Sequence, residues 1–296
     1  MMNLMGLFIA NPLAFIVAVF ALSFSIGFVA IIAGTGGGVL FTSFLLGFTS
    51  IHPDIVRATS LLAAIAGTRI GAQNYLRSIA NIRLALLLAT PYTLFAVCGS
   101  YFGLYLTKHF GNIGIGALKL ALGLIIICIG IMYIFVKRSE YPAARSDAIT
   151  EKLGLEIPYY ERSLNSIIEY KLRRAPLALL LCCVVGFISG TFGLGAGWAI
   201  VPTINLVMLA PLKVATTTSA VVISIGDTAA VFPYMMSGSI IPIFAIPSVS
   251  GLMSRARVGS SVAVKIKAKY VRNILTFLLL FAGIKLLLVG AWMLRI

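Results

Sequence analysis

Two short glycine clusters are the segments of this sequence whose backbone could do chemistry. The cluster at 33–38 has the sequence AGTGGG, and the cluster at 192–197 has the sequence FGLGAG. Glycine costs about 1 kcal/mol per residue in a helix interior, so each cluster should interrupt a helix. The first residues after such an interruption expose free N–H groups and the positive end of a helix dipole, which attract an anion. The clusters therefore predict an anion site, with close helix packing as the alternative role of their glycines.

Two ionisable side chains lie deep inside apolar segments. Arg69 is near the middle of one apolar run, and Asp227 lies at a similar depth in a later run. A charge inside a membrane span is costly, so it usually marks a functional site. A guanidinium can bind two oxygens of an oxyanion at once. We therefore expect Arg69 to bind a substrate anion and Asp227 to carry a coupling proton or sodium ion, with an Arg69–Asp227 ion pair as the structural alternative.

Hydroxyl groups gather near a cation at the start of two apolar runs. These hydroxyls could donate hydrogen bonds to the oxygens of an anion, or return them to carbonyl groups of their own helix. Both patches are candidates for substrate binding. Their members are Arg57, Thr59 and Ser60 in the first run and Thr217, Thr218 and Ser219 in the second.

The elements that must position these residues are apolar spans. The 296-residue chain is 60% hydrophobic and only 10% charged, with a mean hydropathy of +1.06, whereas ordinary globular domains carry about 25% charged residues. This composition excludes a soluble globular domain and indicates a polytopic membrane protein. Shorter apolar runs at 39–50 and 198–210 follow the glycine clusters. Runs long enough to span a membrane lie at 12–33, 55–76, 83–106, 113–136, 176–192, 214–236, 240–262 and 271–294.

The two halves of the chain resemble each other. Residues 27–79 align without a gap on 186–238, and the identical positions include three glycines of each cluster. Duplicated halves are common in transporters. If each cluster turns the chain back as a hairpin, most of the Lys and Arg residues in loops fall on one face, and such residues are retained in the cytoplasm. We therefore predict an inverted repeat with both termini outside and the charged loop 137–174 in the cytoplasm.

The glycine clusters and polar patches together resemble the TauE/SafE sulfite exporter family. GTGGG at 34–38 and GLGAG at 193–197 resemble its duplicated glycine motif, and RATS at 57–60 and ATTTS at 215–219 resemble its Ala-x-x-Thr-Ser element. The resemblance implies secondary transport, as an exporter, of small sulfur-containing anions such as sulfite, sulfonates or sulfoacetate. Pro202 follows the second glycine motif as in the family, but Ser43 replaces the family's proline after the first. The return limb of the first hairpin should therefore be less kinked.

Several other functions find no support in the residues. The histidines are His52 and His109, both in expected outer loops, and the four cysteines lack Cys-x-x-Cys spacing, so we expect no metal site and no cofactor. No pair of residues offers an acid and a base for catalysis, and no nucleotide-binding motif occurs in the required context. The net charge of +15 is concentrated in short loops rather than along a nucleic-acid-binding face. We expect neither an enzyme nor a nucleic-acid-binding protein.

The sequence thus predicts an all-α polytopic protein of the cell membrane, built from two inverted repeats, each a glycine-tipped helical hairpin plus three transmembrane helices. The first repeat covers 1–136, the charged linker 137–174 and the second repeat 175–296. A small anion would bind between the hairpin tips and cross by alternating access. A passive anion channel and a transporter of another small organic anion are the alternatives. The backbone ligands expected are Gly34, Thr35, Gly36, Gly37 and Gly38 in the first cluster and Gly193, Gly195 and Gly197 in the second.

Overall fold

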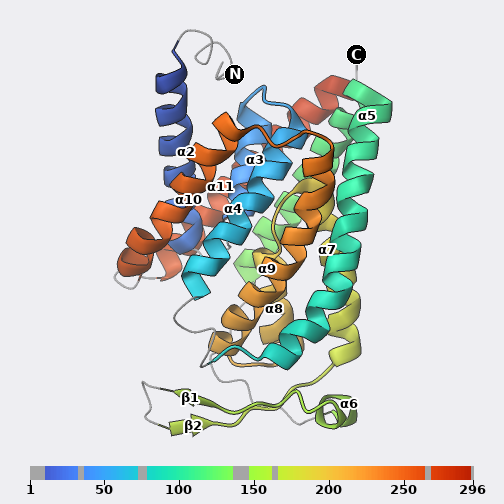
Figure 1. The fold of residues 1–296 in the computed structure, drawn as a ribbon, viewed down its shortest axis with the longest axis vertical. Helices are drawn as coiled ribbons and strands as arrows, with labels where there is room; N and C mark the ends of the chain where they lie inside the picture. Colours follow the sequence, from blue (N-terminus) through green and yellow to red (C-terminus); the bar gives the residue numbers. More distant parts are fainter. Residues whose placement is uncertain are drawn as a thin grey trace.

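The computed structural model describes residues 11–32, 37–72, 79–135, 147–161, 166–263 and 268–294. They form a bundle of helices with a small sheet beneath it (Figure 1). The start of α2 and the end of α11 lie at one end of the bundle, and the sheet lies at the other end. The elements are α2 (Pro12–Ile32), α3 (Gly38–Phe48), α4 (Pro53–Ala72), α5 (Ile82–Phe135), α6 (Ala148–Lys152), β1 (Tyr159–Glu161), β2 (Ser166–Ile168), α7 (Ala175–Phe192), α8 (Gly197–Pro202), the π-helix η1 (Thr203–Val207), α9 (Leu212–Met236), α10 (Pro242–Ala263) and α11 (Ala268–Leu294).

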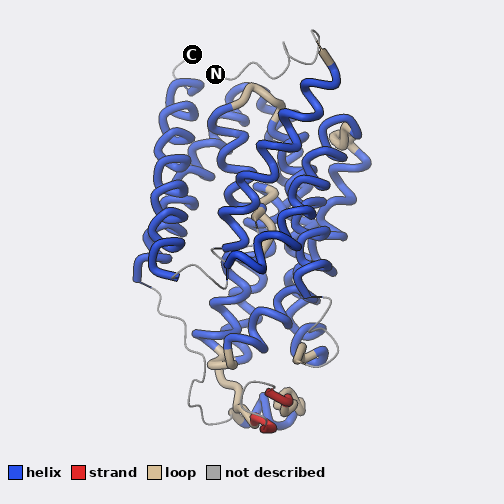
Figure 2. The backbone as a smooth tube through the Cα atoms, turned by 90° about the vertical axis from the view of Figure 1, so that its left-hand side faces the viewer, coloured by secondary structure: helices blue, strands red, loops and turns tan. Residues whose placement is uncertain are grey.

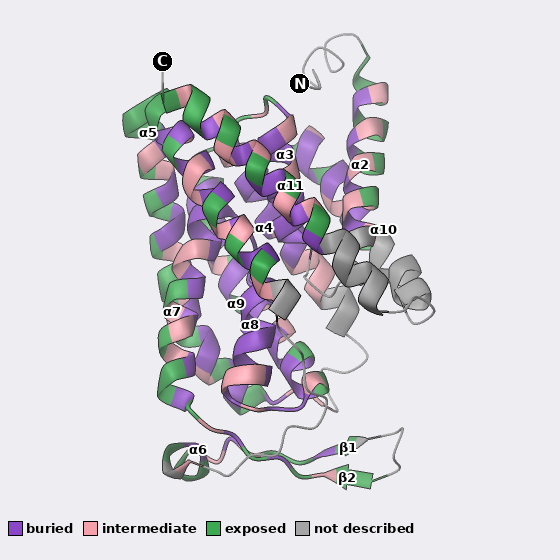
Figure 3. Cartoon of the chain, turned by 180° about the vertical axis from the view of Figure 1, so that it is seen from behind, coloured by how far each residue is buried: buried purple, intermediate pink, exposed green. Residues whose placement is uncertain are grey.

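The composition of the helices is that of a membrane protein. Among the described residues, four helical stretches are long and apolar enough to cross a membrane, and shorter apolar helices accompany them. Large apolar side chains such as Leu94 and Phe277 point outward with 62% and 67% of their surface exposed, which suits contact with lipid. Figure 3 shows exposed residues along the outward faces of the bundle and buried residues inside it. The predicted polytopic, mostly helical protein is confirmed.

The long element α5 contains two helices. Gly111 interrupts it with φ 48° and ψ −124°, a left-handed φ that glycine adopts without the steric penalty of a Cβ. The two parts correspond to the separate spans expected at 83–106 and 113–136. The first part packs against α7 and α9, and the second packs against α11.

Glycines let α5 and α7 approach each other closely. A Cβ added at Gly190 would lie 1.9 Å from the carbonyl oxygen of Ala96, and one added at Gly186 would lie 2.4 Å from that of Tyr92. Neither position has room for a larger residue. This contact fixes α7, the helix that leads into the second glycine cluster, against α5.

The linker folds back on the end of the bundle as a small structure of its own. Strands β1 and β2 pair antiparallel, with Tyr159 opposite Ile168. The amide of Asn81, just before α5, donates to the carbonyl of Leu155 and to the hydroxyl of Tyr170, the latter at 2.9 Å. Burial raises the pKa of Tyr170 above its usual range. The sequence predicts a loop here and misses this hairpin, because three-residue strands carry too little pattern to detect.

Two helices are interrupted at glycine clusters in the middle of the bundle. Residues 33–36 separate α2 from α3, and 193–196 separate α7 from α8. Figure 2 shows non-helical backbone at mid-height, enclosed by helices. Every residue from 189 to 205 is buried, as expected for irregular backbone at membrane depth.

The two limbs that follow the breaks differ in regularity. After the first break, α3 is a single α-helix, and the hydroxyl of Ser43 donates to the carbonyl of Val39 at 2.7 Å. After the second break, α8 gives way at Pro202 to the π-helix η1, because proline cannot donate the next helical hydrogen bond. The less kinked first limb predicted from Ser43 is observed.

Candidate functional site

The two interrupted helices meet at their breaks. A Cβ added at Gly38, the first residue of α3, would lie 2.3 Å from the carbonyl oxygen of Leu194. The hydroxyl of Thr42 donates to the carbonyl of Gly193 at 2.8 Å. The hydroxyl of Ser60 on α4 donates to the carbonyl of Gly38 at 3.2 Å. The start of α3 therefore contacts the second break directly and by a hydrogen bond, just after the end of α7.

The second break presents backbone N–H groups without acceptors. The N–H groups of Gly193 and Leu194 both donate to the carbonyl of Ser189. Those of Gly195 and Ala196 have no acceptor in the part of the chain that the structure describes. Gly193 and Gly195 both have φ 64°, a conformation that favours glycine. Free amides at the start of a helix are suited to binding an anion.

Gly37 lies at the start of α3 and, like Gly193 and Gly195, has a positive φ. It caps the helix with φ 83°, and its carbonyl accepts a hydrogen bond from Phe41 at 3.0 Å. Gly34, Thr35 and Gly36, which the sequence also predicts as ligands, lie outside the described residues. Gly197 begins α8 and is buried.

A buried carboxyl group adjoins the second break. Asp227 on α9 has 0% of its surface exposed, and its Oδ1 accepts a hydrogen bond from the hydroxyl of Tyr92. Its Oδ2 has no partner among the described residues, and a Cβ added at Gly195 would lie 3.4 Å from that oxygen. The bare oxygen of Asp227 therefore faces the backbone that carries the free amides.

Tyr92 links Asp227 to the helix before the break. Its hydroxyl lies 3.0 Å from Oγ of Ser189, whose carbonyl holds the first two amides of the break. Gly226 makes room for the ring, since a Cβ there would lie 2.1 Å from Tyr92 Cδ1. A tyrosine hydroxyl has one hydrogen, so it donates to Asp227 or to Ser189 but not to both. Sequence reasoning missed Tyr92 and Ser189, because contacts between different helices leave no spacing signal in the sequence.

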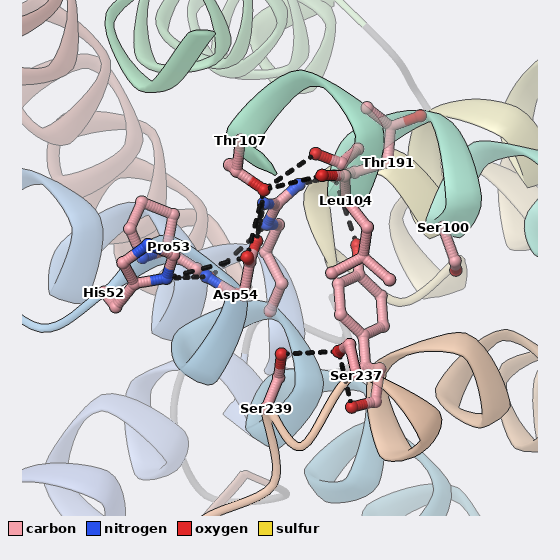
Figure 4. A network of polar contacts seen from close by, with 12 residues as sticks. His52, Pro53, Asp54, Ser100, Leu104, Thr107, Thr191, Ser237 and Ser239 are labelled. Carbon is pink, nitrogen blue, oxygen red and sulfur yellow. Dashed lines mark hydrogen bonds and ion pairs between the residues drawn. The ribbon is translucent and has the colours of Figure 1, made fainter. Parts of the chain in front are cut away.

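The side chain of Arg57 belongs to a polar cluster at the start of α4, in which Asp54, Thr107 and Thr191 lie close together (Figure 4). Its guanidinium pairs with Asp54, donates to the carbonyl of Thr191 at 2.8 Å and lies 5.6 Å from the ring centre of Tyr234. The hydroxyl of Thr107 on α5 donates to Asp54 at 3.0 Å. Arg57, of which 1% is exposed, thus ties α4 to the end of α7.

The remaining predicted residues fall into four groups. Thr217 and Ser219 return their hydrogen bonds to carbonyls of α9 at 2.8 and 2.9 Å, as the alternative explanation of the patch expects. Thr218 instead accepts a hydrogen bond from the N–H of Asn81 at 3.1 Å. Thr59 is buried, and its hydroxyl has no partner among the described residues. The side chain of Arg69 lies outside the described residues, so its predicted role stays a prediction.

Interrupted helices with unpaired backbone groups, enclosed in an apolar bundle beside a buried carboxyl group, are typical of secondary membrane transporters. Comparison with known families agrees with that class. The model of the family described as "Sulfite exporter TauE/SafE" matches residues 19–286, and the chain belongs to this family of membrane transporters. It is also 24% identical over 272 residues to "Probable membrane transporter protein YunE" of Bacillus subtilis (strain 168), covering 89% of this chain and 94% of that protein. No solved structure matches the chain.

Proposed function

We propose that this protein exports small sulfur-containing anions such as sulfite, sulfonates or sulfoacetate, and that the anion binds where the two helix breaks meet. The observation that carries the proposal is the contact of Gly38 with Leu194, because it brings the start of α3 against the break that leads into α8. Each helix start offers N–H groups and the positive end of a dipole to an anion. The sulfur chemistry of the substrate comes from the family.

The proposed ligands of the anion are mainly backbone N–H groups, with a hydroxyl group in addition. The N–H groups of Gly195 and Ala196 are free among the described residues, and Thr59 has a buried hydroxyl without a partner there. Arg69 remains the proposed cationic ligand from the sequence. Arg57 could reach a substrate only by leaving Asp54 and the carbonyl of Thr191, both of which it already binds.

We infer an inverted repeat from the ends of the two returning limbs. The α3–α4 turn borders a cavity together with Trp292 and Met293, near the C-terminus. The end of η1 lies beside the linker instead, where the N–H of Arg173 donates to the carbonyl of Met208 at 3.1 Å. Helices α2 and α10 pack together, as do their expected counterparts α7 and α5. Two limbs that return to opposite ends support rocking of one half against the other as the transport step.

Asp227 is the proposed coupling site. An anion bound to the free amides of the second break would lie close to its bare Oδ2, and a negative carboxylate would repel it. A proton or a sodium ion on Oδ2 removes that repulsion. Anion and cation then each strengthen binding of the other, as linkage requires.

Binding of the anion should stabilise the purified protein against heat, because a ligand that binds only the folded state raises the unfolding temperature. The screen compares sulfite, methanesulfonate, sulfoacetate, sulfate and acetate, each with and without sodium. Stabilisation by the sulfur oxyanions but not by acetate supports the proposal, and equal stabilisation by acetate contradicts the sulfur specificity. Currents far above transporter turnover in planar bilayers would favour a passive channel instead.

The proposed orientation is tested with single cysteines in a variant lacking the four native ones. Ser166 in β2 and Asn112 beside the break in α5 are both exposed and belong to opposite ends of the bundle. Ser166→Cys should react with a membrane-impermeant thiol reagent only after the cells are opened, whereas Asn112→Cys should react in intact cells. The reverse pattern would place both termini in the cytoplasm.

A further inference from the structure

A cavity of about 540 Å³ lies at the end of the bundle where α2 starts and α11 ends. Its walls are the α3–α4 turn, α5 beyond Gly111 and the last turns of α11. It lies at the far end of α3 from Gly38, about 16 Å along an eleven-residue helix. The cavity is therefore separate from the proposed anion site at the helix breaks.

Two lysines line this cavity. Lys119 on α5 is only 8% exposed, and Lys285 on α11 is partly buried. Neither has a hydrogen bond or ion pair with any of the described residues. A buried ammonium group without a partner is costly, and more so within a membrane.

No carboxylate side chain among the described residues pairs with these lysines. Outside the linker the acidic residues of the chain are Asp54 and Asp227. Asp54 pairs with Arg57, and Asp227 is fully buried against Tyr92. Among the described residues no carboxylate is left to pair with either lysine, so a bound anion would supply the compensating negative charge.

The helices that carry the two lysines are closely packed beside the cavity. A Cβ added at Gly290 of α11 would lie 2.8 Å from the backbone N of Leu120, the neighbour of Lys119. On the other side, the stem of Lys285 packs on Gly47 of α3, where a Cβ would lie 3.7 Å from Lys285 Cγ. The lysines thus lie on two closely packed helices, α5 and α11, and the stem of Lys285 also contacts α3.

The rim of the cavity carries exposed side chains. Leu288 and Trp292 on its rim are 64% and 65% exposed, and tryptophan at a helix end is typical of the membrane interface. His52, on the α3–α4 turn, has an exposed side chain. A ligand could therefore place an anionic head between the lysines while an apolar tail lies along α11.

We propose that Lys119 and Lys285 form a second anion site, which binds an oxyanion of the phosphate type. The oxyanion is either the headgroup of an acidic phospholipid or a free inorganic anion. Basic cavities between transmembrane helices bind acidic lipid headgroups in this way. The site is independent of the transported substrate.

The test measures binding in two arms. Native mass spectrometry counts phosphatidylglycerol bound to the protein in a neutral detergent, and thermal unfolding measures stabilisation by inorganic phosphate. Lys119→Met and Lys285→Gln should each weaken binding roughly tenfold, the value of one charge-assisted hydrogen bond. An effect in the lipid arm identifies a headgroup, and an effect in the phosphate arm alone identifies a free anion.

Lys108→Gln is the matched control, because it removes a cation that is exposed on the same helix and does not line the cavity. Its binding in both arms should equal that of the unchanged protein. Lys119→Met should also unfold at a higher temperature than the unchanged protein when no anion is present, since it removes a buried charge. Unchanged binding in both lysine variants, or equal loss in Lys108→Gln, would overturn the proposal.

Discussion

Two acidic residues of this transporter, Asp54 with 13% of its side chain exposed and the fully buried Asp227, have opposite surroundings. Asp54, at the start of α4, meets the guanidinium of Arg57 and the hydroxyl of Thr107. Asp227, in the middle of α9, meets only the hydroxyl of Tyr92 and leaves one oxygen bare among the described residues. A satisfied charge holds structure together, whereas an unsatisfied one is a place where a proton or ion can add.

Neither charged cluster has a charged counterpart in the other half of the chain. In the alignment of 27–79 on 186–238, Arg57 falls on Thr216 and Asp227 falls on Thr68. The glycine breaks are therefore shared by both halves, and the charges are not. The proposed repeat would thus carry its ion-paired cluster in the first half and the proposed coupling residue in the second.

The largest effect on stability is expected for Arg57→Gln. The change leaves Asp54 without its cation and the carbonyl of Thr191 without its donor, and breaking a buried ion pair costs about 3–5 kcal/mol. Thermal unfolding in detergent measures the loss. The double variant Arg57→Gln with Asp54→Asn should recover part of it, because no charge is then left unpaired. Normal stability together with lost anion binding would show that Arg57 is a substrate ligand after all.

The positions of the helix breaks can be predicted from the sequence, but the side chains that contact them cannot. Glycine density at 33–38 and 192–197 is a local property, so it predicts where the helices end. Loop charges add the expectation that the hairpins enter from opposite faces. Both are simple consequences of backbone energetics and membrane insertion.

The chemistry between helices is harder to predict, because it depends on rotation and depth. Asp227 stands out in the sequence as a lone carboxylate, but its contact with Tyr92 joins residues 135 positions apart. Arg57 appears free in the sequence, although Asp54 lies one helical turn before it and pairs with it. Spacing at i and i+3 on a helix was the available signal for that pair.

A smaller effect on stability, with a larger effect on transport, is expected for Gly38→Ala. The new methyl group would lie 2.3 Å from the carbonyl oxygen of Leu194, and such overpacking costs about 1–3 kcal/mol. It would push apart the two helix starts that form the proposed site. Gly47→Ala on the same helix is the control, since its nearest contact is an ordinary 3.7 Å. Uptake into vesicles should fall only for Gly38→Ala, and equal losses in both variants would separate the contact from transport.

The smallest effect on stability is expected for Asp227→Asn, and it separates the two clusters most sharply. Asparagine keeps an oxygen for the hydroxyl of Tyr92 and carries no charge, so the free energy of unfolding should change by less than about 1 kcal/mol. In the unchanged protein, affinity for methanesulfonate should fall as pH rises through the titration of Asp227, because the carboxylate form repels the anion. In Asp227→Asn the affinity should stay high at every pH and become independent of sodium. Asp54→Asn makes the same chemical change in the satisfied cluster, so it should lower stability and leave the pH and sodium dependence of binding intact. If both variants keep that dependence, the cation does not act at Asp227, and Asp227 is a structural residue as Asp54 is.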